Sequence, residues 1–394
     1  MNKLKSLAEV VWVSTLLGLT SFGGPIAHLG YFHNVYVKRR KWIDERSYAD
    51  LVALCQFLPG PASSQVGIGI GTMRAGLLGG VAAWIGFTLP SFLALVLFAF
   101  TMKGLDIGAT GWIHGLKIVA VAIVAHAILG MAQKLIPDRN RATIAIAATV
   151  IALLWQTSLS QISIIFLAAI AGLFLYRKST VTDLSEIQVT IKRDIAVACL
   201  VVFFGLLFLL PAIRELTSSH WIVMFDSFYR AGSLVFGGGH VVLPLLEREV
   251  VTTGWISSEE FLSGYGVTQA VPGPLFTFAA YIGTIMNGWL GAIVATVAIF
   301  LPAFLLVIGV LPFWDSLRRK PKVQGALLGI NAAVVGILVA AFYNPIWTSS
   351  ILAPADFALA AILFGMLAYW KTPSWVVVIT GALGGVAISY FQLV

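Results

Sequence analysis

The sequence predicts an all-α polytopic membrane protein, made of two inverted repeats with discontinuous half-helices at Phe-Gly-Gly and Pro-Gly-Pro motifs. Three observations lead to this fold class. The chain of 394 residues is 59% hydrophobic and only 11% charged, whereas a soluble domain carries about 25% charged residues. Apolar segments long enough to cross a bilayer follow one another along the chain. A series of short motifs in the first half returns in the same order in the second half.

The recurring motifs indicate an internal duplication. Each motif lies 212 to 214 residues before its second copy. The pairs are Phe22-Gly23-Gly24 with Phe236-Gly237-Gly238, Trp42-Ile43 with Trp255-Ile256, Pro59-Gly60-Pro61 with Pro272-Gly273-Pro274, and Leu89-Pro90 with Leu301-Pro302. Because both order and spacing are kept, chance matches do not explain the series. We therefore divide the chain into a first repeat (1–176), a cytoplasmic linker with one linker span (177–213), and a second repeat (214–394).

Further apolar spans follow the motifs in each half. In the first half they are predicted at 79–102, 111–133, 141–156 and 158–176. In the second half they are predicted at 289–312, 323–343, 352–369 and 373–392. The linker span is predicted at 193–213, after the one long polar stretch.

The two repeats are expected to have opposite orientations in the membrane. The loop after the first Phe-Gly-Gly motif holds five cations, which are Lys38, Arg39, Arg40, Lys41 and Arg46. The matching loop of the second half holds one cation among four acids, which are Glu247, Glu249, Glu259 and Glu260. Since Lys and Arg in short loops mark the cytoplasmic side, these loops should lie on opposite faces of the cytoplasmic membrane.

Each Pro-Gly-Pro motif is predicted to separate two half-helices inside the membrane. Pro59 and Pro61 supply no backbone N–H, and Gly60 lets the chain turn. The first motif would therefore separate half-helices at 47–58 and 62–74, and the same argument applies to the second motif. Irregular backbone at that depth is tolerated where protein buries it or where it lines a polar cavity. Inverted repeats with broken helices are a recurrent design of secondary transporters.

The predicted half-helix ends indicate an anion-binding site. A helix N-terminus presents free N–H groups and about half a positive charge, so two inverted copies would aim positive ends at one midplane cavity. We expect the substrate-binding residues to come from the motifs and from polar side chains beside them. These are Gly23, Gly24, Gln56, Pro59, Gly60, Pro61, Ser63, Ser64, Gln65, Gly237, Gly238, Gly239, Gln269, Pro272, Gly273, Pro274 and Thr277. The alternative is that Pro-Gly-Pro is a packing kink without a ligand.

Three ionisable residues, Arg74, Arg230 and His240, complete the candidate set. An ionisable group inside a membrane segment is costly and is commonly functional. A guanidinium donates two parallel hydrogen bonds, which suits a tetrahedral oxyanion. The alternatives are that Arg74 snorkels to the interface and that His240 makes a structural hydrogen bond.

The motifs together resemble those of the chromate ion transporter family, in its two-domain, long-chain form. The resemblance runs through both halves and rests on Phe22-Gly23-Gly24-Pro25, Trp42, Pro59-Gly60-Pro61, Gly71 to Gly76, Phe236-Gly237-Gly238-Gly239-His240, Trp255, Pro272-Gly273-Pro274 and Leu301-Pro302. It implies a secondary transporter that exports chromate across the cytoplasmic membrane and confers chromate resistance, with sulfate as a close analogue. The preference for an anion follows from the residues, whereas chromate follows only from the resemblance.

Two other functions are open at this point, and each has its own signature. An oxyanion channel, or a carrier of sulfate or another oxyanion, would share the same fold. A membrane-embedded enzyme would need a nucleophile–base pair, a nucleotide motif or a set of metal ligands, and the sequence pattern shows none of these. We therefore expect no enzyme activity, no cofactor and no metal.

The expected partners are the oxyanion and the lipid bilayer. The 25 basic residues exceed the 17 acidic ones, but they fall in short loop clusters rather than on one basic face, so we expect no nucleic acid. Glycine-rich faces at 76–80 and 381–385 allow close helix contact, within one chain or between the two chains of a homodimer.

Overall fold

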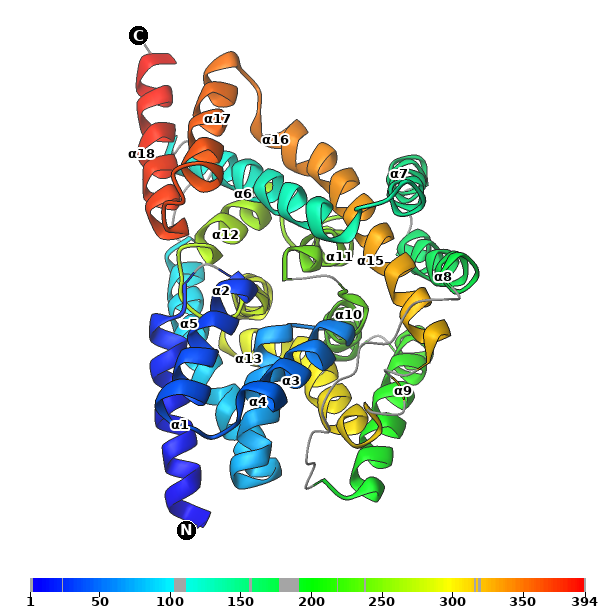
Figure 1. Cartoon of the computed structure of the whole chain (residues 1–394). Coiled ribbons are helices and arrows are strands. Elements are labelled where there is room, and N and C mark those ends of the chain that lie inside the picture. The colour runs from blue at the N-terminus through cyan, green and yellow to red at the C-terminus, as the bar shows by residue number, and fades with distance from the viewer. Residues whose placement is uncertain are drawn as a thin grey trace.

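The computed structural model describes residues 3–22, 24–102, 111–155, 158–176, 191–217, 219–236, 239–314, 317 and 320–392. These residues form helices joined by turns and short extended segments, and no strand occurs among them (Figure 1). Five helical segments in this part of the chain are long and apolar enough to cross a membrane. They are Leu77–Met102, Gly111–Leu135, Arg193–Leu216, Leu275–Phe313 and Pro321–Ser350. The predicted class, an all-α multi-pass membrane protein, is confirmed.

The first half opens with two pairs of helices that end near its motifs. Helix α1 (Lys3–Thr20) stops just before Phe-Gly-Gly, and α2 (Gly24–Phe32) continues as the π-helical turn η1 (His33–Arg39). Helices α3 (Glu45–Phe57) and α4 (Ala62–Ala75) are separated by the first Pro-Gly-Pro motif. Asp44 starts α3, because its carboxylate accepts the N–H groups of Arg46 and Ser47 at 3.0 Å each.

The second half opens with the corresponding helices. Helix α10 (His220–Leu234) precedes the second Phe-Gly-Gly motif, and η3 (Gly239–Val241) with α11 (Val242–Val250) follows it. Helix α12 (Ser258–Thr268) precedes the second Pro-Gly-Pro motif, and η4 (Leu275–Thr277) with α13 (Phe278–Val310) follows it. Helix α13 is interrupted at Asn287 and Gly288. The positive φ of Gly288, 60°, matches that of Gly76, 73°, which lies between α4 and α5 (Leu77–Met102).

The remaining helices complete the two halves. The first half continues with α6 (Gly111–Leu135), α7 (Arg139–Leu154) and α8 (Ser158–Leu175), and the linker span is α9 (Arg193–Leu216). The second half continues with η5 (Leu311–Phe313), α15 (Pro321–Ala341), η6 (Phe342–Trp347), α16 (Thr348–Ser350), α17 (Pro354–Ala368) and α18 (Ser374–Gln392).

The outer helices of each half pack on the other half. Helix α6 lies along α17 and α18, whereas α15 lies along α7 and α8 (Figure 1). Glycines permit the close approach: a Cβ on Gly115 would lie 2.1 Å from the Gly381 carbonyl oxygen. A Cβ on Gly336 would lie 2.1 Å from the carbonyl oxygen of Ala145. The glycine-rich face at 381–385 is thus covered by α6 of the same chain.

The helices contribute both to a buried core and to an exposed apolar surface. Large side chains that are fully buried include Phe32 and Tyr36 from α2 and η1, Tyr229 from α10, and Tyr265 and Phe278 beside the second Pro-Gly-Pro motif. Large apolar side chains that are exposed include Trp12 on α1, Phe166 on α8, Phe208 on α9 and Leu383 on α18. An exposed apolar surface of this kind suits a hydrocarbon solvent, so lipid surrounds a bundle whose centre is the broken helices.

Candidate functional site

The helix breaks of the two halves are joined by crossed backbone hydrogen bonds. The Gly60 N–H donates to the Val235 carbonyl oxygen at 2.7 Å, and the Gly273 N–H donates to the Ser21 carbonyl oxygen at 3.0 Å. Val235 and Ser21 each stand directly before a Phe-Gly-Gly motif. Each Pro-Gly-Pro turn therefore contacts the Phe-Gly-Gly break of the other half, and the breaks meet at one place.

Both turns need glycine. Gly60 and Gly273 have φ values of 117° and 105°, which L side chains rarely adopt. A Cβ on Gly60 would lie 3.2 Å from the Ala303 Cβ, and one on Gly273 would lie 2.8 Å from the Ser91 Oγ. Each glycine thus packs against the long helix of the other half, and the backbone can approach only because no side chain intervenes.

The start of α4 carries backbone donors that precede its first helical hydrogen bond. That bond runs from the Gln65 N–H to the Pro61 carbonyl oxygen at 3.0 Å, so the N–H groups of residues 62–64 lie beyond the ladder. Ser63, Ser64 and Gln65 are all buried. Within the described part of the chain, the Ser64 Oγ and the Gln65 Oε1 have no hydrogen-bond partner. A buried helix start with unused polar atoms can accept a ligand.

The side chains beside this start are tied to other motif residues. The Gln65 Nε2 donates to the Pro59 carbonyl oxygen at 2.8 Å. The Ser63 Oγ lies 3.3 Å from the His28 Nδ1. The Ser63 hydroxyl and the Gln65 amide nitrogen are engaged in these contacts. The Ser64 hydroxyl is therefore the side-chain donor at the helix start that has no partner among the described atoms.

The second Pro-Gly-Pro motif is arranged more tightly. The Thr277 N–H and the Thr277 hydroxyl both donate to the Pro274 carbonyl oxygen, at 3.0 and 2.6 Å. This helix therefore starts with a 3-10 turn, and the Thr277 hydroxyl is engaged in it. The two preceding glutamines also differ, since Gln269 is buried whereas Gln56 is exposed.

A polar cavity of about 290 Å³ lies against three of the predicted site residues, Gly24, His240 and Gln269. Its other lining residues come from α6 and from the hairpin between α17 and α18. They are Ile123, His126, Leu367, Lys371, Thr372, Pro373 and Ser374. None of these lining residues is Asp or Glu. The Gln269 side chain is buried, and its Nε2 has no hydrogen-bond partner among the described atoms. The His240 Nδ1 lies 2.7 Å from the Tyr265 hydroxyl oxygen.

Arg74 lies away from the breaks and is paired. It stands 12 residues after Ala62, the first residue of α4, which at 1.5 Å per residue is about 18 Å along the helix. Its Nη2 lies 3.0 Å from the Glu9 Oε2, and its guanidinium carbon lies 5.2 Å from the centre of the Trp42 ring. The structure thus gives Arg74 an ion pair and a cation–π contact.

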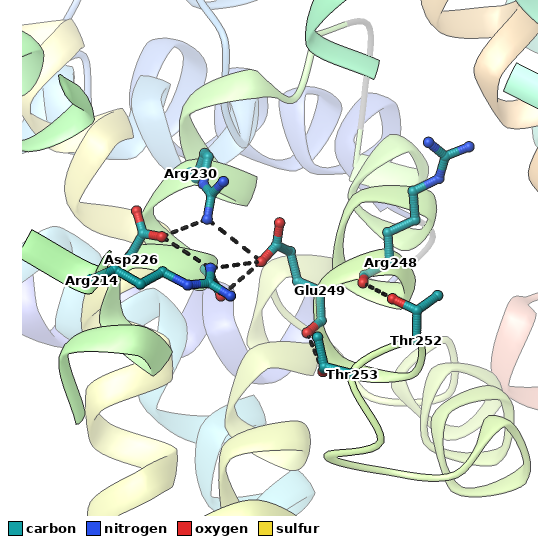
Figure 2. Close-up of polar contacts among 8 residues, drawn as sticks. Arg214, Asp226, Arg230, Arg248, Glu249, Thr252 and Thr253 are labelled. Atoms are coloured by element: carbon teal, nitrogen blue, oxygen red, sulfur yellow. Dashed lines mark hydrogen bonds and ion pairs between the residues drawn. The ribbon is translucent and has the colours of Figure 1, made fainter. Parts of the chain in front are cut away.

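Arg230 belongs to a cluster of two arginines and two carboxylates (Figure 2). Its Nη2 lies 2.5 Å from the Asp226 Oδ2 and 3.6 Å from the Glu249 Oε2. The Arg214 Nη1 approaches the same two carboxylates, at 3.2 and 3.5 Å. Two cations and two anions make the cluster neutral, so the guanidinium of Arg230 is compensated within the protein.

The other predicted residues have simpler positions. Pro59 and Pro272 are half-buried and Pro274 is buried beside the turns. Gly239 begins η3. Gly23, Gly237 and Gly238 lie outside the described residues.

Four polar lining residues, His126, Lys371, Thr372 and Ser374, were not expected at the site from the sequence. A signal for Ser374 exists, because a polar residue after Pro373 and before an apolar run is typical of a helix start. No local signal shows that this start packs beside residues of the helix breaks.

Broken helices joined across two halves of a multi-pass membrane protein, beside a polar cavity, define a membrane transporter of the broken-helix class. The sequence model of the family described as "Chromate transporter" matches residues 8–173 and again residues 222–386. The chain therefore belongs to the chromate transporter family. The second match begins 214 residues after the first, which is the offset between the Phe-Gly-Gly motifs.

Two similar transport proteins cover most of the chain, and a third covers less than half of it. A chromate transport protein of Pseudomonas aeruginosa is 28% identical over 93% of this chain and 88% of its own length. A probable chromate transport protein of Synechococcus elongatus is 30% identical over 85% of this chain and 84% of its own. An uncharacterized transporter of Bacillus subtilis, YwrA, is 28% identical over 98% of its own length but only 43% of this chain. No solved structure matches the chain.

Proposed function

We propose that this protein is a secondary transporter that exports chromate, or a sulfate-like tetrahedral oxyanion, across the cytoplasmic membrane and confers chromate resistance. One observation carries the proposal. In a chain of the chromate transporter family, the helix breaks of both halves meet beside a polar cavity, and no carboxylate is among the described residues that line it. Such a place favours an anion over a cation.

The proposed anion site lies between the helix starts at Pro61 and Pro274, and backbone N–H groups hold the anion. The buried hydroxyl of Ser64, which has no partner among the described atoms, supports a side-chain contribution on the first side. The Thr277 hydroxyl is engaged with Pro274, so on the second side it fixes the turn. Opposite membrane orientation of the two repeats would make these starts point toward one another.

The membrane potential is sufficient to drive export. Moving one charge through 100 mV changes the free energy by about 2.3 kcal/mol, and a dianion leaving a negative-inside cell gains about twice that. Export of chromate therefore requires no coupled ion on energetic grounds, whereas uptake would require one.

Tracer flux in proteoliposomes tests the proposal. The internal face of the vesicle is made negative with K⁺ and valinomycin at equal pH on both sides, and efflux of labelled chromate is followed. We expect saturable, potential-dependent efflux that sulfate or molybdate inhibits in competition, with protein-free vesicles as the control. Fast, unsaturable conductive flux would indicate a channel, and absence of potential-dependent flux would refute the proposal.

A further inference from the structure

The cavity beside the breaks has a second wall, which comes from the last hairpin of the chain. Lys371, Thr372, Pro373 and Ser374 form this wall, between the end of α17 and the start of α18. We propose that Lys371, the first turn of α18 and the side chain of Gln269 together bind the oxyanion in this cavity. The inference rests on the proposed function and adds a binding position in this cavity, which lies beside the helix breaks and is not lined by Pro61 or Pro274.

The hairpin lies beside the middle of α6 rather than beside either of its ends. Ile123 and His126 line the same cavity and follow Gly111, the start of α6, by 12 and 15 residues. At 1.5 Å per residue they lie about 18 to 22 Å along a helix long enough to span the bilayer. The opposite wall consists of Gly24, His240 and Gln269, at or beside the breaks. Lys371 therefore lines a cavity about midway along α6.

The start of α18, at Ser374, lies at the cavity and carries backbone donors outside the helical hydrogen-bond ladder. The first helical hydrogen bond in this turn runs from the Val376 N–H to the Pro373 carbonyl oxygen at 3.0 Å, so the N–H groups of Ser374 and Trp375 precede it. The helix has 19 residues, long enough for a full helix dipole at its N-terminus. The Thr372 hydroxyl and N–H both donate to the Met366 carbonyl oxygen at 2.9 Å, so Thr372 holds the hairpin closed.

Gln269 supplies the independent sign of a ligand. Its side chain is only 7% exposed, and within the described residues its Nε2 has no hydrogen-bond partner. A buried amide without a partner costs free energy unless a ligand or water satisfies it. Gln269 lines the same cavity as Lys371.

The chemistry of the lining favours an anion. A lysine ammonium, an amide N–H and helix-start N–H groups are all donors, and no Asp or Glu is among the described lining residues. A cavity of about 290 Å³ has room for a five-atom oxyanion and several waters, since a water takes about 30 Å³ in the liquid. The ligand class is thus a tetrahedral oxyanion such as chromate or sulfate.

The backbone at Lys371 makes a clean test possible. Its φ is 52°, in the left-handed region where glycine is the usual residue at a helix end. Lys371→Gly therefore removes the ammonium and suits the turn. Lys41 has almost the same backbone, with a φ of 51°, is exposed, and does not line the cavity. Lys41→Gly is the matched control, because it removes one cation and relaxes one residue elsewhere.

Equilibrium binding of labelled sulfate and chromate to the purified full chain in detergent measures the contribution of each residue. Lys371 is open to solvent, so we expect Lys371→Gly to weaken binding about tenfold, and Gln269→Leu by a similar factor. Lys371→Arg should keep most of the affinity, and Lys41→Gly should bind like the wild type. Thermal unfolding of each variant establishes that it is folded, with Lys371→Gly expected to melt no lower than the wild type.

The outcomes separate this inference from the proposed function. If the wild type binds the oxyanions and Lys371→Gly binds them equally well, the hairpin is not part of the site and the inference fails alone. If Lys371→Gly and Lys41→Gly weaken binding to the same extent, the effect is general surface charge and the inference also fails. If the wild type neither binds nor transports any oxyanion, the proposed function itself fails.

Discussion

The Gly60 N–H donates a hydrogen bond of 2.7 Å to the carbonyl oxygen of Val235, more than 170 residues further along the chain. The counterpart bond, from Gly273 to Ser21, runs in the opposite direction along the sequence. Both bonds lie at helix breaks inside a membrane protein, where an unpaired N–H costs several kcal/mol. The two halves therefore satisfy each other's irregular backbone, and neither half alone would keep its breaks in this form. A displacement of one Pro-Gly-Pro turn must move the Phe-Gly-Gly break of the other half with it.

Alanine at the turn glycines should destabilise the protein and lower its affinity for the oxyanion. Gly273→Ala places a Cβ 2.8 Å from the Ser91 Oγ at a φ of 105°, whereas at Gly60 the nearest atom is 3.2 Å away. We expect losses of about 1 to 3 kcal/mol in unfolding free energy, larger at Gly273. Gly205 in α9 is the control, since a Cβ added there would have no atom within 4 Å. Equal melting temperatures for Gly273→Ala and Gly205→Ala would contradict the packing argument.

The inverted orientation of the repeats can be tested with single cysteines. In a background with Cys55 and Cys199 replaced by alanine, Lys41→Cys and Thr253→Cys place thiols on the two matching loops, where both native residues are exposed. The loop charges predict that an impermeant maleimide labels position 253 in intact cells and position 41 only after permeabilisation. Labelling of both positions from the same side would show that the repeats are parallel.

Asp138 should stabilise the protein in a pH-dependent way. Its carboxylate accepts the Arg141 N–H at 3.0 Å, the Arg141 Nε–H at 2.6 Å and the Tyr176 hydroxyl at 2.8 Å. The backbone N–H of Arg141 is the main cause that lowers the pKa of this loop carboxyl from 3.8 to about 2. A carboxyl whose pKa is lower in the folded protein than in the unfolded chain stabilises the fold at pH values above the unfolded pKa. The contribution of Asp138 is therefore present above about pH 4 and disappears as the pH falls toward 2.

The variant Asp138→Ala measures this contribution. Loss of the helix cap should cost about 1 kcal/mol at pH 7, because the side chain is partly exposed and water screens its ion pair. Thermal unfolding in detergent should show a gap in melting temperature between wild type and variant at pH 7. This gap should become smaller near pH 2. A gap that stays constant between these two values would rule out the carboxylate as its cause.

Sequence reasoning succeeded where the physical cause is local. An all-α membrane class follows from composition and apolar length, and it is confirmed. The ends of α3 and the start of α4 fall within a residue or two of the predicted half-helices, because proline and glycine act on the backbone at their own positions. Whether the two halves are inverted stays a prediction, since loop charge reports orientation only relative to a membrane.

The ion-pair partners of the charged residues could not be predicted from the sequence, because tertiary packing determines which charged side chains lie together. Glu9 forms an ion pair with Arg74, 65 residues further along the chain, and no sequence pattern near either residue predicts this pair. Asp226 and Arg230 lie four residues apart on one helix, and this spacing predicts their contact. Glu249 on α11 also approaches Arg230, and no sequence spacing predicts that second contact. Lys371 is similar, because its place in the cavity depends on how deeply the last hairpin inserts beside α6.

The charge cluster of Figure 2 should tolerate the loss of a pair better than the loss of one member. Asp226 is 1% exposed and accepts from both Arg214 and Arg230. Arg230→Gln leaves two carboxylates facing one guanidinium, and Asp226→Asn leaves two guanidinium groups facing one carboxylate. Removing one partner of a buried pair costs about 3 to 5 kcal/mol, whereas removing both restores neutrality. We therefore expect the double variant, with Asp226→Asn and Arg230→Gln together, to have a higher melting temperature than either single variant.

Oxyanion affinity of the same double variant decides what Arg230 does. If its guanidinium serves only the cluster, the folded double variant should bind chromate within about twofold of the wild type, because the neutral side chains leave the breaks in place. If Arg230 binds the anion during transport, as the sequence alone suggested, the double variant should lose about tenfold or more in affinity while remaining folded. The variant Arg230→Lys gives a second test, because lysine keeps the charge but lacks the planar guanidinium that donates two parallel hydrogen bonds. If Arg230 binds the anion, this variant should lose more oxyanion affinity than stability. Equal losses of stability and affinity in the double variant and in Arg230→Lys would show that a structural role of Arg230 is sufficient and would remove it from the binding site.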